Sequence, residues 1–257
     1  MNELLSSLII AIVQGLTEWL PVSSSGHLVL AEKLLGVQNP SLFFDVALHF
    51  GTLMAVFVYF GSDIVDIVKD LISGKFSSEN GRLGLLIIVA TIPAALAGFF
   101  LKEIFEKVFN SLAITALGFG ITGIFLIIAS LSKERSHALN TKSAFVIGVA
   151  QIFALFPGIS RSGSTLGSGL LFGLKEKQAI KFSFLMSIPI IFGANILVIG
   201  NNALPSNLIW ATLVAFIVGL GTIHLLYGKI LTSRKNLKWF GFYALALAIV
   251  LGIILII

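Results

Sequence analysis

Long apolar segments alternate with short polar ones along the chain, and six of these segments are long enough to cross a bilayer. They cover roughly residues 42–60, 83–101, 112–131, 182–200, 208–227 and 239–257. A membrane-spanning helix needs about 20 mainly apolar residues, because each residue adds about 1.5 Å along the helix axis. The pattern therefore predicts six transmembrane helices.

Two further apolar regions are interrupted by polar and helix-breaking residues. Residues 4–36 contain Glu18, Pro21, Ser23, Ser24, Ser25, Gly26 and His27, and residues 143–173 contain Pro157, Gly158, Ser160, Arg161, Ser162 and Gly163. Irregular backbone at membrane depth must be buried in protein or face a watery cavity. Each region is therefore predicted to be a re-entrant hairpin of two short helical legs, with a pair of short kinked spans as the alternative.

Composition and charge support this layout. Hydrophobic residues make up 57% of the chain and charged residues 11%, against about 25% charged in ordinary globular proteins. These values exclude a water-soluble or disordered chain. With two re-entrant hairpins, thirteen lysines and arginines fall on one side of the membrane and three on the other. Cytoplasmic segments carry the excess of basic residues, so both termini are predicted to lie outside. Because the basic residues follow this membrane pattern, the net charge of +5 does not indicate nucleic-acid binding.

The two interrupted regions resemble each other. A shift of 137 residues superposes Gln14 on Gln151, Ser23 on Ser160, Ser25 on Ser162 and Gly26 on Gly163. Each half then holds one hairpin and three spans, and an odd number of spans makes the second half enter from the opposite face. The predicted fold is an all-α integral membrane protein, one domain over 1–257, with inverted-topology repeats at about 1–131 and 140–257. A plain six- or eight-helix bundle is the alternative.

The first candidate site combines Gln14 and Glu18, which lie four residues apart and share a helix face. Two oxygen-bearing side chains on one face could hold a hard divalent cation together with water and phosphate. A carboxylate inside a membrane is expensive unless it is paired, which favours a functional role. The structural alternatives are an ion pair for Glu18 and a backbone cap for Gln14.

The second candidate site centres on Arg161 in the loop that begins at Pro157 and Gly158. A glycine turn before a helix N-terminus directs backbone N–H groups at an anion. The guanidinium adds a permanent, planar charge that suits phosphate oxygens. The structural alternative is a pair between Arg161 and Glu18.

The nucleophile has two candidates. A serine hydroxyl beside a histidine can be activated, or the histidine can attack phosphorus itself, so Ser24 and His27 are both retained. His27 could equally be a neutral core residue, and the serines could cap the second leg. Asp45 and His49, four apart in the first span, either support the site or satisfy each other.

Two signatures in this order resemble the bacterial undecaprenyl-diphosphatases of the bacitracin-resistance type. The first is residues 14–28, from Gln14 through the three serines to Leu28, and the second is residues 157–165, from Pro157 to Thr165. The resemblance extends over essentially the whole chain. It implies hydrolysis of undecaprenyl diphosphate to undecaprenyl phosphate and inorganic phosphate, which recycles the lipid carrier of cell-wall synthesis and confers bacitracin resistance.

The resemblance also implies site residues. Catalysis is assigned to Glu18, Ser24, His27 and Arg161, and diphosphate binding to Ser23, Ser25, Ser160, Arg161, Ser162, Gly163 and Thr165. A divalent cation, Mg²⁺ or Ca²⁺, is expected on Glu18 and Gln14, although Gln14 stands where the family also has glutamate. The expected location is the bacterial inner membrane, multi-pass, with the active site open to the outer face. The expected partners are a polyprenyl diphosphate lipid, the bilayer and, as an open alternative to a monomer, a second copy.

A transporter remains the rival function, because inverted repeats with broken helices are also transporter architecture. A flippase for a polyprenyl phosphate would use the same Arg161 and serines. Glu18 and His27 beside Ser24 favour the enzyme, because binding alone does not require acid–base groups. An ion channel is disfavoured because no polar stripe continues through the spans.

Overall fold

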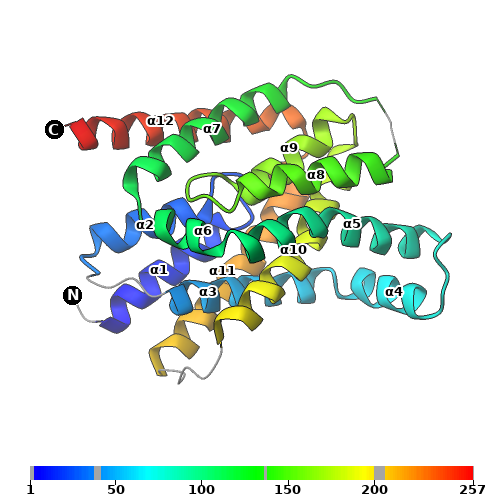
Figure 1. Ribbon diagram of the computed structural model, residues 1–257, viewed down its shortest axis with the longest axis horizontal. Coiled ribbons are helices and arrows are strands. Elements are labelled where there is room, and N and C mark those ends of the chain that lie inside the picture. The colour runs from blue at the N-terminus through cyan, green and yellow to red at the C-terminus, as the bar shows by residue number, and fades with distance from the viewer. Residues whose placement is uncertain (1–2, 38–41, 136–137, 200–205, 257) are drawn as a thin grey trace.

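The computed structural model describes residues 3–37, 42–135, 138–199 and 206–256 (Figure 1). Within these residues all regular secondary structure is helical. The helices are α1 (Glu3–Thr17), α2 (Ser24–Leu34), α3 (Leu42–Tyr59), α4 (Gly61–Ile72), α5 (Glu79–Phe100), α6 (Lys102–Phe109), α7 (Leu112–Ser130), α8 (Thr141–Phe153), α9 (Arg161–Leu171), α10 (Glu176–Ile199), α11 (Ser206–Leu225) and α12 (Leu237–Ile256). A π-helical turn, Leu226–Ile230, and a 3₁₀ turn, Arg234–Asn236, connect α11 to α12.

Six helices are long and apolar enough to cross a membrane: α3, α5, α7, α10, α11 and α12. They match the six predicted spans and confirm an integral membrane protein. Two of them begin at least a full turn earlier than predicted, α5 at Glu79 and α10 at Glu176. The extra turn of α5 is polar and follows Ser78, whose hydroxyl accepts a hydrogen bond from the Gly81 N–H. Residues 200 and 257 of the predicted spans lie outside the described part of the chain.

Two short helices, α4 and α6, were not predicted, because the hydropathy pattern placed their residues in loops. Both are amphipathic. In α6 the charged side chains of Lys102, Glu103, Glu106 and Lys107 lie on one face, and Phe105 is buried on the other. Amphipathic helices of this kind lie along a membrane interface rather than across it.

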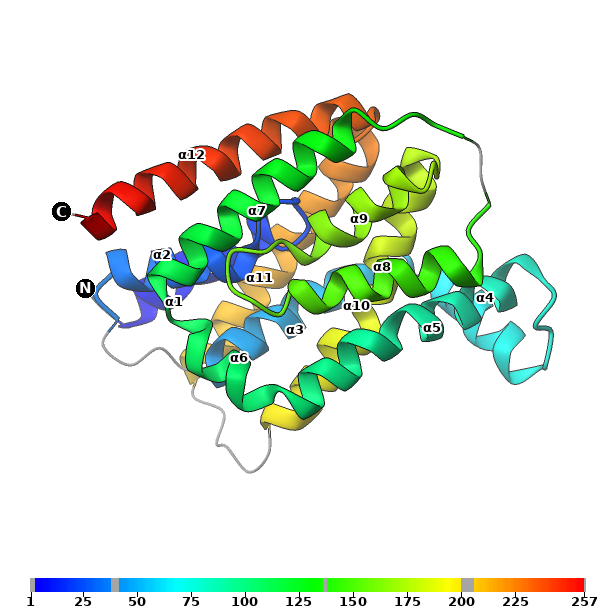
Figure 2. The same cartoon turned by 45° about the horizontal axis from the view of Figure 1, so that its top comes forward.

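Both interrupted regions form helical hairpins, α1 with α2 and α8 with α9. Each hairpin packs on a long helix from the other half of the chain, α1 on α11 and α8 on α5. Helices α7 and α12 run side by side along one edge of the bundle (Figure 2). The same kind of pairing thus occurs in both halves of the chain, and the inverted topology stays a prediction.

The break between α8 and α9 is fixed to α7 by Thr122. Its hydroxyl donates to the Gly158 carbonyl at 2.9 Å and accepts from the Ser160 N–H at 3.0 Å. Gly158 has a φ of +85°, and a Cβ there would lie 2.2 Å from the Thr115 carbonyl oxygen. Only glycine fits, since it both adopts positive φ and allows this close approach.

The two breaks are also fixed to each other. Ser162 at the start of α9 donates a hydrogen bond of 2.9 Å to the Leu20 carbonyl of the first break. Between the breaks, Trp19 is fully buried and its ring contacts the ring of Phe184 on α10. The irregular segments therefore meet inside the bundle, where their polar backbone groups find partners.

Candidate active site

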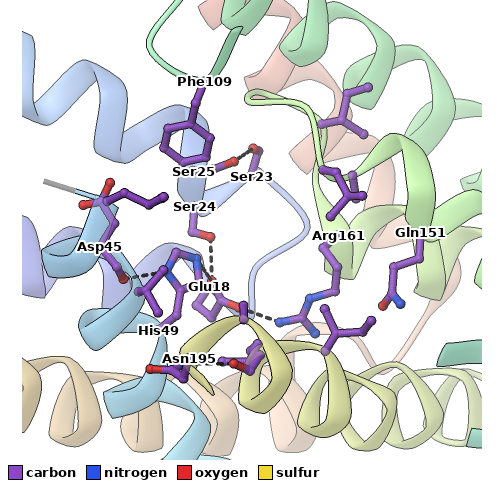
Figure 3. Close-up of a pocket in the computed structure, with 18 residues that line it drawn as sticks. Glu18, Ser23, Ser24, Ser25, Asp45, His49, Phe109, Gln151, Arg161 and Asn195 are labelled. Carbon is purple, nitrogen blue, oxygen red and sulfur yellow. Dashed lines mark hydrogen bonds and ion pairs between the residues drawn. The ribbon is translucent and has the colours of Figure 1, made fainter. Parts of the chain in front are cut away.

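A cavity of about 220 Å³ lies where the two breaks meet, and its polar wall comes from both halves of the chain (Figure 3). The polar residues that line it are Glu18, Ser23, Ser24, Ser25, Asp45, His49, Gln151, Arg161 and Asn195. The remaining wall is mainly apolar and includes Phe109 and Leu155. This composition, a few convergent polar groups on an apolar wall, is typical of ligand sites.

Glu18 is the centre of the polar network. Its Oε1 accepts a hydrogen bond from Arg161 Nη2. Its Oε2 accepts from Ser24 Oγ at 2.6 Å and from Gln14 Nε2 at 2.9 Å, and His49 Nε2 lies 3.4 Å away. The side chain of Glu18 is 4% exposed, so the guanidinium and the donors compensate a charge that water does not reach.

Ser24 is presented to the cavity by a strained turn. Ser23 precedes it with a φ of +66°, the only positive φ outside glycine among the described residues. Ser23 caps α2, and its Oγ accepts from the Gly26 N–H at 3.3 Å. Such backbone strain costs of order 1–3 kcal/mol and is found mainly at functional sites. Here it directs the Ser24 hydroxyl at Glu18 rather than along the helix.

Arg161 is the first residue of α9 and reaches back across the cavity to Glu18 (Figure 3). Its guanidinium also lies 5.4 Å from the centroid of the Trp19 ring, a cation–π distance. One nitrogen, Nη1, is buried and has no hydrogen-bond partner among the described residues. The ion pair proposed as a structural alternative is therefore present, and it leaves Nη1 available for a ligand.

His27 does not line the cavity. Its Nδ1 bonds the Ser23 carbonyl at 2.7 Å, and its Nε2 bonds the Tyr243 hydroxyl of α12 at 2.8 Å. Because a carbonyl only accepts, Nδ1 carries the proton, so the ring holds the strained Ser23 turn in place.

The histidine at the cavity is His49, whose Nδ1 bonds the Asp45 carbonyl at 2.8 Å while Nε2 faces Glu18.

The second signature contributes only Arg161 among its predicted phosphate-binding residues. Ser160 Oγ caps α9 by accepting from the Gly163 N–H at 3.0 Å. Thr165 Oγ1 lies 2.6 Å from Ser183 Oγ of α10. Together with the bond from Ser162 to the first break, these contacts are structural. Ser160, Ser162, Gly163 and Thr165 do not line the cavity, whereas Ser23 and Ser25 do.

Two polar residues at the cavity were not predicted as site residues. Gln151 is 1% exposed, and neither its Nε2 nor its Oε1 has a partner among the described residues. Asn195 has a buried Oδ1 without a partner there, as does Asp45. A buried amide without partners is costly, so these groups are suited to a polar ligand. The repeat superposition of Gln14 on Gln151 was the available signal for one of them.

A preformed metal site is not visible in the described residues, which contain no cluster of three or more His, Asp or Glu side chains suited to a metal. Both oxygens of Glu18 already accept hydrogen bonds from protein donors. Gln14 directs its Nε2 at Glu18 and leaves Oε1 buried without a partner. Gln14 and Glu18, the two residues expected to hold the cation, therefore bond to each other as donor and acceptor. This arrangement does not fit a chelated divalent ion.

The fold and the cavity define a class, namely a polytopic membrane protein with a buried, partly polar cavity between two broken helical hairpins. The sequence profile of the bacitracin resistance protein BacA family matches residues 7–250. The chain belongs to this family.

Individual relatives are similar over nearly their whole length. The undecaprenyl-diphosphatase of Caldicellulosiruptor bescii is 44% identical over 254 residues, 95% of each chain. The undecaprenyl-diphosphatase of Rubrobacter xylanophilus is 39% identical and aligns over 100% of both chains. That of Methanococcus vannielii is 35% identical and covers 93% of this chain.

Proposed function

We propose that the chain hydrolyses undecaprenyl diphosphate to undecaprenyl phosphate and inorganic phosphate, with Ser24 as the nucleophile. Family membership supports the reaction. One observation supports the assignment of Ser24: its hydroxyl donates to Glu18 at 2.6 Å, while the other oxygen of that carboxylate accepts from Arg161. The proposed nucleophile Ser24, the base Glu18 and the guanidinium of Arg161 thus share one cavity. Covalent phosphoryl transfer needs this arrangement.

In the first step, Ser24 Oγ bonds to the terminal phosphorus as the bond from that phosphorus to the bridging oxygen breaks. Glu18 takes the hydroxyl proton and passes it through His49 to the bridging oxygen of the departing undecaprenyl phosphate, so Glu18 is ionised again before the second step. In the second step, water attacks the phosphoserine, Glu18 accepts a proton from the water, and the serine oxygen leaves and is reprotonated. His49, 3.4 Å from Glu18, is placed to relay protons between that carboxyl and the leaving oxygen.

Arg161 and Gln151 bind the diphosphate. The free Nη1 of Arg161 and the unpartnered amide of Gln151 line the same side of the cavity (Figure 3). Fixed donors aimed at phosphate oxygens stabilise the charge that spreads over them in the transition state. This positioning requires no rearrangement of the loops, because the break residues are already held by Thr122 and Ser162.

We propose that a divalent cation, Mg²⁺ or Ca²⁺, binds to the protein only together with the substrate. Such ions are commonly held by one or two carboxylates together with substrate phosphates and water. We assign that role to Asp45, which lines the cavity and has an Oδ1 without a partner among the described residues. Both oxygens of Glu18 already accept hydrogen bonds from protein donors. When bound, the cation would neutralise phosphate charge.

The cavity is proposed to open to the outer face of the bacterial inner membrane. Its lining includes Leu42 at the start of α3 and Phe109 at the end of α6, and these helix ends lie toward the end of the bundle where α1 begins and α12 ends (Figure 1). The basic residues Lys69, Lys75 and Arg82 lie around α4 and the start of α5, at the other end. By the positive-inside rule we assign that other end to the cytoplasmic side. No contact among the described residues favours the flippase.

The test is a rapid acid quench of purified protein mixed with undecaprenyl diphosphate labelled in the terminal phosphate. The unmodified protein should release phosphate and carry acid-stable label on Ser24. Ser24→Ala should lower release by about a thousandfold or more and abolish the label. The matched control is Ser25→Ala, which removes a neighbouring hydroxyl of the same cavity and should cost at most about tenfold. Full turnover by Ser24→Ala would overturn the assignment.

A further inference from the structure

The cavity continues into a second, larger space between α5, α6 and α10. This groove has a volume of about 770 Å³ and shares Phe109, Leu155 and Ile190 with the wall of the catalytic cavity. Beyond the shared wall it is lined by Ala94, Ala95, Gly98 and Phe99 of α5 and by Pro189 and Gly193 of α10. The two spaces therefore adjoin each other, and the wall of the second is mainly apolar.

The groove is wide because α5 and α10 carry little side-chain volume there. A Cβ added at Gly193 would meet no atom within 4 Å, and one at Gly98 would meet only Leu155 Cδ1 at 3.9 Å. Packing glycines elsewhere behave differently: at Gly51 and Gly148 an added Cβ would lie 2.4 and 2.3 Å from backbone oxygens. Close helix packing therefore does not require glycine at 98 or 193, and these positions instead leave open space.

Helix α6 forms part of the groove wall. Lys102, Phe105 and Glu106 line it, with Phe105 buried and the two charged residues exposed. Since α6 is amphipathic and follows directly after α5 (Figure 2), it lies at the membrane interface. An apolar ligand that enters at the catalytic cavity is thereby directed sideways, between α5 and α10, toward the hydrocarbon.

We infer that this groove receives the isoprenoid chain of the substrate and that Gly98 and Gly193 are the positions that admit it. The inference rests on the proposed function, because a diphosphate held by Arg161 must place its first isoprene units at an apolar exit. Leu155, which borders both spaces, marks that exit. The groove holds the units nearest the diphosphate, and the rest of the chain lies among the lipids.

The experiment compares Gly193→Leu and Gly98→Leu with Gly221→Leu, a control on α11 where an added Cβ also meets nothing within 4 Å. Phosphate release is measured with undecaprenyl diphosphate and with dimethylallyl diphosphate, which has a single isoprene unit. A leucine in the groove overpacks the space for the chain. Each groove variant should therefore lower the ratio of kcat/KM for the long substrate to that for the short one by about tenfold or more, and the control should not.

Binding of undecaprenyl phosphate to the detergent-solubilised protein gives a readout that needs no hydrolysis. The groove variants should bind this lipid about tenfold more weakly than the control variant. Unchanged ratios and unchanged binding in both groove variants would overturn the inference. If the unmodified protein hydrolysed no diphosphate, the proposed function would fail, while weaker lipid binding by the groove variants would still support the groove.

Discussion

The buried pair between Arg161 and Glu18 makes a quantitative prediction about stability. The two side chains are 14% and 4% exposed. Removing one partner of such a pair costs about 3–5 kcal/mol, because the other charge stays buried without compensation. In Arg161→Ala, Glu18 keeps the bonds from Ser24 and Gln14, so the lower end, about 3 kcal/mol, is expected.

At about 2–4 °C per kcal/mol for a chain of this size, Arg161→Ala should lower the Tm by roughly 6–12 °C. Glu18→Gln should lower it less, since glutamine still accepts from Ser24 and the guanidinium keeps its contact with Trp19. The double variant should recover about 2 kcal/mol relative to the sum of the single changes, because neither charge is then left alone.

The assay is thermal unfolding of the purified variants in one detergent, with phosphate release measured on the same samples below the Tm. Arg161→Ala and the double variant should both be inactive, although only the first is strongly destabilised. Unchanged Tm values in both single variants, or strictly additive shifts in the double variant, would show that the pair does not form.

Three other predictions concern single residues. His49→Ala should lower kcat by about a hundredfold, whereas His27→Ala should mainly lower the Tm. If His27→Ala instead lowered kcat and His49→Ala lowered only the Tm, His27 would be the catalytic histidine and His49 the structural one. Gln151→Leu should leave the Tm unchanged or raise it, since no hydrogen bond is lost, and should raise KM; an unchanged KM would remove Gln151 from the diphosphate site. Gly158→Ala should prevent recovery of monodisperse protein on size exclusion, because its Cβ would lie 2.2 Å from a carbonyl oxygen; normal folding would contradict the described turn.

The spans could be predicted from the sequence because the bilayer imposes a length and a polarity on each of them. Helices α4 and α6 could not, since amphipathic segments of this length resemble polar loops in hydropathy. The broken hairpins were recognisable for a local reason, namely that Pro21 and Gly158 stand inside otherwise apolar stretches. The contact between the two breaks depends on the hydrogen bond from Ser162 to the Leu20 carbonyl, and neither residue signals this pairing in the sequence.

The site was predicted in part, and the limits are physical. Glu18 and Arg161 were identifiable because a charged side chain inside a membrane is costly and is therefore usually functional or paired. The role of His27 was open because a sequence motif does not determine which way the imidazole ring points. Here the ring points at the hydroxyl of Tyr243, more than two hundred residues away in the sequence. Asn195 could not be found, because an amide in an apolar helix looks the same whether it faces a cavity or lipid.

The two hairpins place different chemistry at matching positions. The shift of 137 residues that superposes the two hairpins also places Ser24 on Arg161 and Glu18 on Leu155. Ser24 and Arg161 are each the first residue of an eleven-residue helix capped by a serine. Equivalent positions in the two hairpins thus hold the proposed nucleophile, Ser24, in one half and the guanidinium of Arg161 in the other. Neither half carries both groups, so the cavity needs both hairpins, and the predicted repeat is symmetric in backbone but not in chemistry.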